Sequence, residues 1–555
     1  MTDFNTTALE WVATDPDPLT KQAGQALLDS GDSAIIADHF GRRLAFGTAG
    51  MRGPLGPGPN RMNRALVRRV AQALGAYLID TVDGAKERPI VVGFDGRHGS
   101  RAFAADSAGI LMNQGFTVYA FDAVCATPQL AHAITHLNAV AGIMVTASHN
   151  PPQDNGYKVY WGNGAQIIPP HDAGISAAID AIDHCPEPGS DPPLPIPESV
   201  WSDYIDRVLS LRVRPATGVR AVYTAMHGVG WRPLKAILDA AGHTDVHPVA
   251  AQRDPDGDFP TVRFPNPEED GALDLAIAHA QDLGAELIVA NDPDADRLAV
   301  ALQDADGRWV RLTGNQVGAL LAEELLAHGP AHPQRMVATT IVSTILLKKI
   351  ASRHGAICGE TLTGFKWLAN LALAHDGPFV LGFEEALGYS VGDVVRDKDG
   401  LSATLLLLDL ASTLKARGLT LWDALARLDA AHGAHRSAQL AIKLDGEAGA
   451  RAIEGVMRML RTHPPSELAG SDVVYMRDLQ SRIGIDCTTG ASSEVMLPAS
   501  NVMEFTLGDG TRVLARPSGT EPKIKFYVEA VGKTGAEADA RTAEVIRAVR
   551  KYAKL

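Results

Sequence analysis

The sequence predicts an α/β protein with mostly parallel sheets and an α+β domain at its C-terminal end. Strand-like and helix-like runs alternate from about residue 60 to 430, and such an order favours a parallel sheet with helices on both faces. With 555 residues, of which 46% are hydrophobic, the chain is long enough for several domains of roughly 100–200 residues each. The last section, about 436–555, has a different pattern of hairpin, strand and closing helix.

The first unit contains three strand-like runs at 89–95, 116–122 and 139–148. A helical pattern over 100–115 lies between the first two, as a parallel connection requires. The proline-rich segment 185–197 indicates a loop near the end of this unit.

Two further units follow, and each places polar residues directly after an apolar strand. The second unit begins with the strand 220–228 and ends with 285–297. The third has a helix at 314–329, strands at 336–345 and 379–389, and a helix near 420–433. Ligands bind at the carboxyl ends of strands in open α/β sheets, so the polar loops at these ends are the candidate sites.

The C-terminal section predicts a hairpin over 501–519 that turns at Gly508-Asp509-Gly510. Another strand at 523–532 and a helix at 536–553 complete an α+β domain.

Composition excludes several classes of protein. The formal net charge is −14 and no basic block is present, which argues against nucleic acid as a partner. The four cysteines lie far apart and form no CxxC pattern, so neither a cysteine zinc site nor a disulfide framework is predicted. The start of the chain is acidic without an apolar signal-like run, and the most apolar helical run, 401–414, is too short to span a bilayer. We expect a reduced, cytoplasmic location without membrane attachment.

The stretch that follows Ala141–Val145 combines a hydroxyl, an imidazole and an amide, Ser148-His149-Asn150, with two prolines. Ser148 is either a nucleophile presented by a buried strand or an ordinary turn residue. No GxSxG pattern surrounds it, which argues against the nucleophile elbow of the α/β-hydrolases.

Three alternating carboxylates, Asp292, Asp294 and Asp296, come just after the second unit's last strand. Oxygen ligands in a tight loop suit a hard cation such as Mg²⁺. An EF-hand is excluded, because Arg297 and Gln303 occupy the places that need glycine and glutamate. The simpler alternative, a solvated acidic turn, explains poorly why the acids follow a buried strand.

Three more loops have polar residues suited to anions or sugars. The loop 515–527 offers a guanidinium, hydroxyls and backbone amides that can surround a phosphate, from Arg516, Ser518, Gly519 and Thr520, with Lys523 and Lys525 beyond. The glycine-rich loop 46–63 presents Arg52, and the loop 382–389 presents Glu384 and Glu385 as acceptors for sugar hydroxyls. Each loop alone also fits an ordinary turn, but together with the serine and the cation site they make the parts that phosphoryl transfer needs.

The motifs TASHNP, DPDADR, GFEEALG and RPSGTEPKIKFY, in this order, resemble those of the α-D-phosphohexomutase superfamily, over nearly the whole chain. The long form of the first motif looks most like the branch with bacterial phosphoglucomutases and phosphomannomutases, animal phosphopentomutase and glucose-1,6-bisphosphate synthase. The resemblance implies three related α/β domains with mixed sheets and a C-terminal α+β domain around a central cleft. We place these domains at 1–210 (phosphoserine), 211–311 (metal), 312–434 (sugar) and 435–555 (phosphate).

The resemblance also implies a role for each motif. Ser148 would be carried as phosphoserine, and Mg²⁺ would sit on Asp292, Asp294, Asp296 and a phosphate oxygen of Ser148. Glu384, Glu385, Thr363 and Lys398 would contact the sugar, and Arg297 the phosphoserine region. Arg516, Ser518, Gly519, Thr520 and Lys525 would hold the other phosphate, and Arg52, Lys158 and His149 would lie near the transferred phosphoryl group.

The mechanism this implies is a mutase reaction. Phospho-Ser148 gives its phosphoryl group to a sugar monophosphate, and the bisphosphate reorients and returns its other phosphoryl group. Glucose 1,6-bisphosphate would prime the enzyme. Arginine is a poor base, so His149 and Lys158 rank ahead of Arg52 for the hydroxyl proton. A hexose 1-phosphate/6-phosphate mutase for glucose, and for mannose too, is the predicted function, in a monomer or homodimer.

One departure concerns the sugar loop, where many relatives read Glu-x-Ser and this chain reads Glu384-Glu385-Ala386. A phosphopentomutase or a glucose-1,6-bisphosphate synthase on the same site is therefore an alternative. A second alternative is a phosphatase or phosphotransferase with Asp292 as nucleophile and Asp294 as acid, although Asp296-Arg297 departs from the usual pattern of such enzymes. A non-catalytic sugar-phosphate sensor is disfavoured, because Ser148 and the aspartates are all present.

Overall fold

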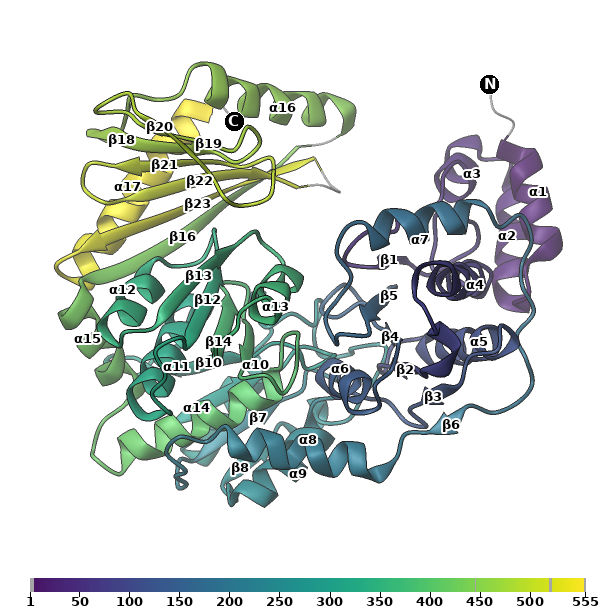
Figure 1. Ribbon diagram of the computed structural model, residues 1–555, viewed down its shortest axis with the longest axis horizontal. Helices are drawn as coiled ribbons and strands as arrows, with labels where there is room; N and C mark the ends of the chain where they lie inside the picture. Colours follow the sequence, from purple (N-terminus) through teal and green to yellow (C-terminus); the bar gives the residue numbers. More distant parts are fainter. Residues whose placement is uncertain (1–3, 445, 519–521, 554–555) are drawn as a thin grey trace. The chain divides into compact units, whose positions relative to one another are not determined.

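The computed structural model describes residues 4–444, 446–518 and 522–553. The chain divides into two compact units (Figure 1). The larger comprises Met1–Val317 and Phe365–Arg417, and the smaller Gly318–Gly364 and Gly418–Leu555. The four domain boundaries given above stay our proposal.

The first sheet of the larger unit has four parallel strands and an antiparallel pair at one edge. Its order is β1-β5-β4-β2-β3-β6, with β5 antiparallel to both β4 and β1. Every residue of β2 and β4 is buried, which explains their unbroken apolar sequences. The strands are β1 (Met51–Pro54), β2 (Ile90–Phe94), β3 (Val118–Ala120), β4 (Ala141–Val145), β5 (Asp154–Trp161) and β6 (Leu194–Pro195).

Helices cover this sheet, and α4 begins at a recognisable side-chain cap. The Asn63 side chain accepts a hydrogen bond from Leu66 N at the start of α4, a helix with a long buried face. Helices α5 and α6 both pack on β2 and β4. The bounds are α4 (Arg64–Thr81), α5 (Ser100–Asn113), α6 (Thr127–His136), α7 (His171–Asp180) and α8 (Glu198–Ser210). The N-terminal helices α1 (Phe4–Thr14), α2 (Pro18–Ser30) and α3 (Ser33–Phe40) were not predicted from the sequence.

The second sheet repeats the same plan in the order β11-β10-β9-β7-β8. Strands β7, β8 and β9 are parallel, and β10 and β11 are antiparallel at the edge. The mixed sheets expected from the resemblance are thus confirmed. The elements are β7 (Ala221–Thr224), α9 (Trp231–Ala241), β8 (Val246–Pro248), α10 (Asp274–Leu283), β9 (Leu287–Ala290), β10 (Ala299–Gln303) and β11 (Trp309–Arg311).

The rest of the larger unit consists of α13 (Phe365–Leu373), the antiparallel pair β14 (Phe379–Glu384) and β15 (Gly388–Val391), and α14 (Gly400–Lys415). Asp399 caps α14 by accepting from Leu401 N and Ser402 N. Nearly all of α14 is buried, so its apolar sequence belongs to a core helix. Within the described residues, no helix is long and apolar enough to cross a membrane.

The smaller unit contains the C-terminal α+β domain, which confirms that prediction. Strands β21 and β22 pair as the expected hairpin, with Met503 opposite Ala515, and Gly510 at the turn has a left-handed φ of 85°. Helices α16 and α17 both contact β23, and Figure 1 shows them alongside the yellow-green strands. The strands are β16 (Ala434–Lys443), β17 (Glu467–Leu468), β18 (Ser471–Asp478), β19 (Ile483–Asp486), β20 (Ser492–Glu494), β21 (Met503–Leu507), β22 (Arg512–Pro517) and β23 (Lys523–Gly532), and the helices are α16 (Gly446–Thr462) and α17 (Gly535–Ala553).

The parallel pair β12 (Met336–Thr340) and β13 (Ile357–Thr361) also belongs to the smaller unit, with α12 (Leu346–Arg353) and α15 (Leu421–His432). Helix α11 (Gly314–His328) spans the boundary of the two units in the sequence.

Candidate active site

Ser148 lies on the connection between the antiparallel strands β4 and β5, in which Met144 pairs with Lys158. Its backbone is left-handed, with φ of 51°, and its N–H donates to Thr146 Oγ1 at 2.8 Å. A non-glycine residue in this region costs of order 1–3 kcal/mol, so its surroundings must hold it there. The side chain is buried at 2% exposure. Ser148 is therefore more than a solvated turn residue.

The Arg97 guanidinium holds this loop in place. It donates four hydrogen bonds to backbone carbonyls, at distances of 2.5 to 3.0 Å. The acceptors are the carbonyls of Ser148, Asn150, Pro151 and Asp154. Buried Asp95 lies 3.5 Å from Arg97 Nε. Sequence reasoning missed Arg97, although Asp95-Gly96-Arg97 directly follows β2, the parallel neighbour of β4.

The three aspartates form one buried cluster on the loop after β9. Ala295 turns the chain with a left-handed φ of 56°, and one carboxylate oxygen of each aspartate lies within 4.8 Å of the others. Ser148 Oγ donates to Asp292 Oδ2 at 2.8 Å. Two motifs separated by 144 residues thus meet at one point.

The donor set of this cluster fits a hard divalent cation. Asp294 Oδ1 and Asp296 Oδ1 are buried and have no hydrogen-bond partner among the described residues. Burial and the charges of Asp296 and Asp294 raise the pKa of the Asp292 carboxyl well above its ordinary value. A cation bound by these carboxylate oxygens would give the two unpaired oxygens a partner. It would also offset the repulsion among the three negative charges.

Two lysines neutralise part of this charge. Lys158 Nζ lies 2.6 Å from Asp294 Oδ2 and 3.1 Å from Asp296 Oδ2, and Lys398 Nζ lies 3.1 Å from Asp296 Oδ2. Burial alone would lower the pKa of Lys158, but the two carboxylates outweigh it and raise the pKa. Lys158 is therefore protonated in this arrangement and acts as a cation, which ranks it below His149 as a base.

His149 is a neutral imidazole beside the serine. Its Nδ1 lies 3.1 Å from Ser148 Oγ, and its Nε2 lies 3.5 Å from an Arg297 guanidinium nitrogen. Burial, followed by the charges of Arg297 and Arg52, lowers the pKa of His149 well below its ordinary value. A neutral imidazole in this position can accept a proton from a nearby hydroxyl.

Arg52 and Glu384 lie in the same unit. Arg52 pairs with Gly156 across β1 and β5, and its buried Nε has no partner in the described part of the chain. Glu384 ends β14 with a mostly buried side chain, and its charge contributes to raising the pKa of Lys398 and of Arg297. Glu385 follows it in the turn to β15, where it is half-buried.

The predicted phosphate-binding residues belong to the smaller unit. Arg516 and Lys525 are directly opposite each other in the β22–β23 pair, and Ser518 N donates to Lys523 O at 2.7 Å. Like charges that face each other across strands are unfavourable, and an anion between them would remove the penalty. Thr363 is also in this unit, with a buried Oγ1 that has no partner among the residues described. Gly519 and Thr520 lie outside the described residues.

Four family models match the chain in sequence. They are the phosphoglucomutase/phosphomannomutase α/β/α domains I (residues 43–185), II (202–307) and III (313–429), and the C-terminal domain (473–548). The chain belongs to the phosphoglucomutase/phosphomannomutase family.

Relatives of this family member differ in the sugar they are named for. A probable phosphomannomutase of Haemophilus influenzae is 44% identical over 88% of this chain and 97% of its own. Human phosphopentomutase is 38% identical over 95% of this chain and 91% of its own. A phosphoglucomutase/phosphomannomutase family protein from Burkholderia thailandensis has the same fold, with a TM-score of 0.68 at 22% identity, over 92% of this chain and 97% of its own.

Proposed function

We propose that this protein is a phosphosugar mutase that interconverts hexose 1-phosphate and hexose 6-phosphate, with α-D-glucose as the preferred sugar and mannose as a second substrate. The contact that supports this best is the hydrogen bond from Ser148 Oγ to Asp292 in the aspartate cluster. It brings a hydroxyl nucleophile to a cation site, as phosphoryl transfer through a serine ester requires.

In the proposed reaction Ser148 Oγ bears a phosphoryl group at the start of each cycle. Its P–O bond breaks as the free hydroxyl of the sugar monophosphate forms a new one, and His149 takes the hydroxyl proton and passes it to the departing Ser148 Oγ. The resulting bisphosphate reorients, and its other phosphoryl group returns to Ser148 Oγ, whose proton passes through His149 to the departing sugar oxygen. Lys158 and Arg52 supply positive charge near the transferred group.

Asp292, Asp294 and Asp296 would hold Mg²⁺ together with an oxygen of the Ser148 phosphate. When bound, the cation offsets negative charge that builds up on the transferring oxygens. The side chains would also fix the loop geometry, because Asp292 binds both Ser148 Oγ and Arg297 N.

The remaining predicted residues would bind the rest of the substrate. We assign Glu384, Glu385, Thr363 and Lys398 to the sugar, Arg297 to the phosphoserine region, and Arg516, Ser518, Gly519, Thr520 and Lys525 to the non-reacting phosphate. Glucose 1,6-bisphosphate would prime the serine. All four cysteines are free thiols, which suits a reducing cytoplasm. We propose that the enzyme works there as a monomer or homodimer.

Phosphopentomutase or glucose-1,6-bisphosphate synthase activity is a second candidate. The loop Glu384-Glu385-Ala386 offers no hydroxyl at its third position. The match to human phosphopentomutase also extends over 95% of this chain.

Initial rates with α-glucose 1-phosphate, α-mannose 1-phosphate and ribose 1-phosphate, each with Mg²⁺ and priming glucose 1,6-bisphosphate, test the proposal. We expect the highest kcat/KM for the glucose ester. A preference for ribose 1-phosphate would overturn the hexose assignment, but the assignment as a phosphosugar mutase would still hold. Net release of inorganic phosphate in place of an isomer would overturn the mutase itself.

A further inference from the structure

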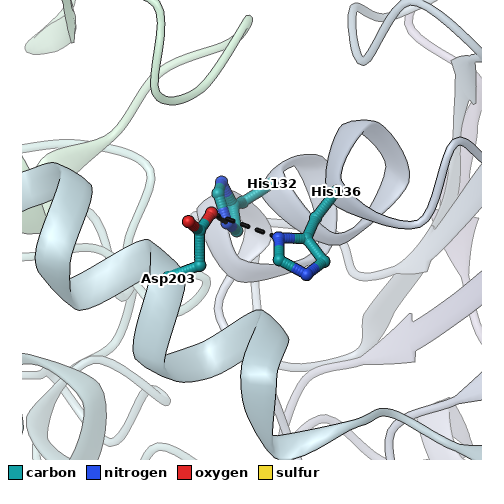
Figure 2. A group of neighbouring side chains, drawn as sticks. All are labelled: His132, His136 and Asp203. Atoms are coloured by element: carbon teal, nitrogen blue, oxygen red, sulfur yellow. Dashed lines mark hydrogen bonds and ion pairs between the residues drawn. The ribbon is translucent and has the colours of Figure 1, made fainter.

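A second group of possible metal ligands lies away from the aspartates, between α6 and α8. His132 and His136 are four residues apart on α6 and point toward Asp203 of α8 (Figure 2). Asp203 Oδ2 lies 3.0 Å from His132 Nε2 and 3.1 Å from His136 Nδ1. One ligand atom of each residue is within 4.8 Å of the other two.

His132 is fully buried, and one of its two ring nitrogens lacks a hydrogen-bond partner among the described residues. Its Nδ1 lies 3.3 Å from the carbonyl of Val394, which can only accept, so Nδ1 carries the hydrogen. Its Nε2 then presents a lone pair toward the Asp203 carboxylate. These two atoms are close but not in hydrogen-bond geometry, and Nε2 has no hydrogen-bond partner among the described residues. The lone pair of His132 Nε2 and the Asp203 carboxylate repel each other at 3.0 Å, and a cation between them would remove this repulsion.

The distances between these ligand atoms suit a transition metal of intermediate hardness, such as zinc. Ligands of a tetrahedral zinc ion, at about 2.0–2.1 Å from the metal, are roughly 3.3 Å apart, close to the 3.0 and 3.1 Å seen here. Two histidines at i and i+4 on one helix face are a known way to bind zinc. Histidine ligands of metals usually donate their other ring N–H to a carbonyl or carboxylate, as His132 does to Val394.

Among the described residues, the charge of Arg207 acts on Asp203 and His132, but its guanidinium is engaged by another carboxylate. Arg207, one turn beyond Asp203, pairs with Asp393 at 2.9 Å. The side chains of His136 and Asp203 are 26% and 40% exposed, so an ion and a fourth, water ligand can reach the site.

We propose that His132, His136 and Asp203 bind a divalent transition metal of the zinc class. The ion would join α6 to α8. Helix α6 begins at Thr127, whose N–H donates to the Asp294 carbonyl at 2.9 Å and whose hydroxyl donates to Asp294 Oδ2 at 2.6 Å. A metal on α6 and α8 therefore stabilises a helix that also positions the aspartate cluster.

Isothermal titration with Zn²⁺ in excess Mg²⁺ tests the site, since Mg²⁺ competes for the all-oxygen cluster and poorly for histidine. We expect one tight zinc equivalent for the wild type. His136→Gln and Asp203→Asn should each weaken it by at least about 100-fold, because each removes a direct ligand. His247→Gln is the matched control, since His247 and Asp245 form a half-buried pair at 2.7 Å outside this cluster, and its zinc affinity should equal that of the wild type.

Thermal unfolding of the same proteins with and without Zn²⁺ gives a second measure. Zinc should raise Tm for the wild type and for His247→Gln, but not for the two ligand variants, all in Mg²⁺. Absence of a tight equivalent in the wild type, or its persistence in both His136→Gln and Asp203→Asn, would overturn the proposal. Both substituted side chains are partly exposed, and unfolding without zinc reports whether each variant is folded.

Discussion

Two regions of the larger unit gather possible metal ligands, and they do so in different ways. Asp292, Asp294 and Asp296 stand on one loop at the end of β9, whereas His132, His136 and Asp203 stand on two helices. The loop cluster offers only oxygen and meets Ser148, so it suits a hard cation in phosphoryl chemistry. The helical cluster offers nitrogen and oxygen and contacts no nucleophile in the described structure. Each cluster has three ligands, so their number does not distinguish a catalytic metal site from a structural one. The ligand atoms and the residues next to the site do.

Another buried carboxylate, that of Asp409 on α14, has its hydrogen bonds and its charge satisfied by protein side chains. Arg212 binds it with two hydrogen bonds at 2.7 and 2.8 Å, and His243 Nε2 lies 3.0 Å away. The Arg212 guanidinium supplies a positive charge that balances this carboxylate. Asp409 therefore needs no metal.

The largest expected effect is that of Ser148→Ala. We expect kcat to fall by on the order of 10³-fold or more, because the variant has no oxygen to carry the phosphoryl group. Intact mass should show a phosphoryl adduct on the wild type and none on the variant. Ser107→Ala, in which another buried serine of this unit is removed, should keep both the adduct and most of the activity. An adduct on Ser148→Ala that is labile to base would instead favour an acyl phosphate on Asp292.

Metal removal should come next in size. Chelation should abolish activity, and Mg²⁺ should restore it. Asp296→Asn should need at least about tenfold more Mg²⁺ for half-maximal rate, since it removes a charged oxygen from the cluster. Asp306→Asn alters a solvated acidic turn between β10 and β11 and should have the Mg²⁺ dependence of the wild type. Equal Mg²⁺ curves for all three proteins would argue against the aspartate cluster as the metal site.

Arg97→Lys should lower kcat by about 100-fold with little change in KM, because a lysine cannot bind the four carbonyls that shape the Ser148 loop. Arg101→Lys is the matched control, since Arg101 lies at the exposed start of α5 and donates to the carbonyl of Asp122, beyond β3. If the two variants had the same kcat, Arg97 would be only a structural residue.

The last prediction concerns the stability of the folded protein, through the pH dependence of Asp409. Burial raises the pKa of its carboxyl, but hydrogen bonds from Arg212 and His243 outweigh burial, so the folded pKa lies below the ordinary 3.8. The resulting stability is present above the unfolded pKa and is lost as pH falls through the folded pKa. Asp409→Asn should be less stable by about 3 kcal/mol at neutral pH, and denaturant unfolding should show the gap narrowing between about pH 5 and pH 3. A gap independent of pH would contradict the ionised assignment.

The sequence was enough to predict most of the secondary elements and the loop of three alternating aspartates, which the structure shows as one buried cluster. Apolar runs such as Ala141–Val145 are strands because they are buried on both faces, and that requirement shows in the composition itself. Arg97 and the helical cluster were missed for the opposite reason. The side chain of Arg97 acts on a loop more than 50 residues away, and Asp203 meets His136 across 67 residues.

The sequence by itself determined the α/β class, the order of the motifs and the presence of three alternating carboxylates after a buried strand, because these depend on residue type and on local periodicity. Only the tertiary structure decided that Ser148 Oγ meets Asp292, that Lys158 is paired with carboxylates, and that His132 has an unsatisfied nitrogen. The physical reason is that charge, proton affinity and hydrogen bonding depend on burial and on neighbours brought together by packing, which no single stretch of sequence contains.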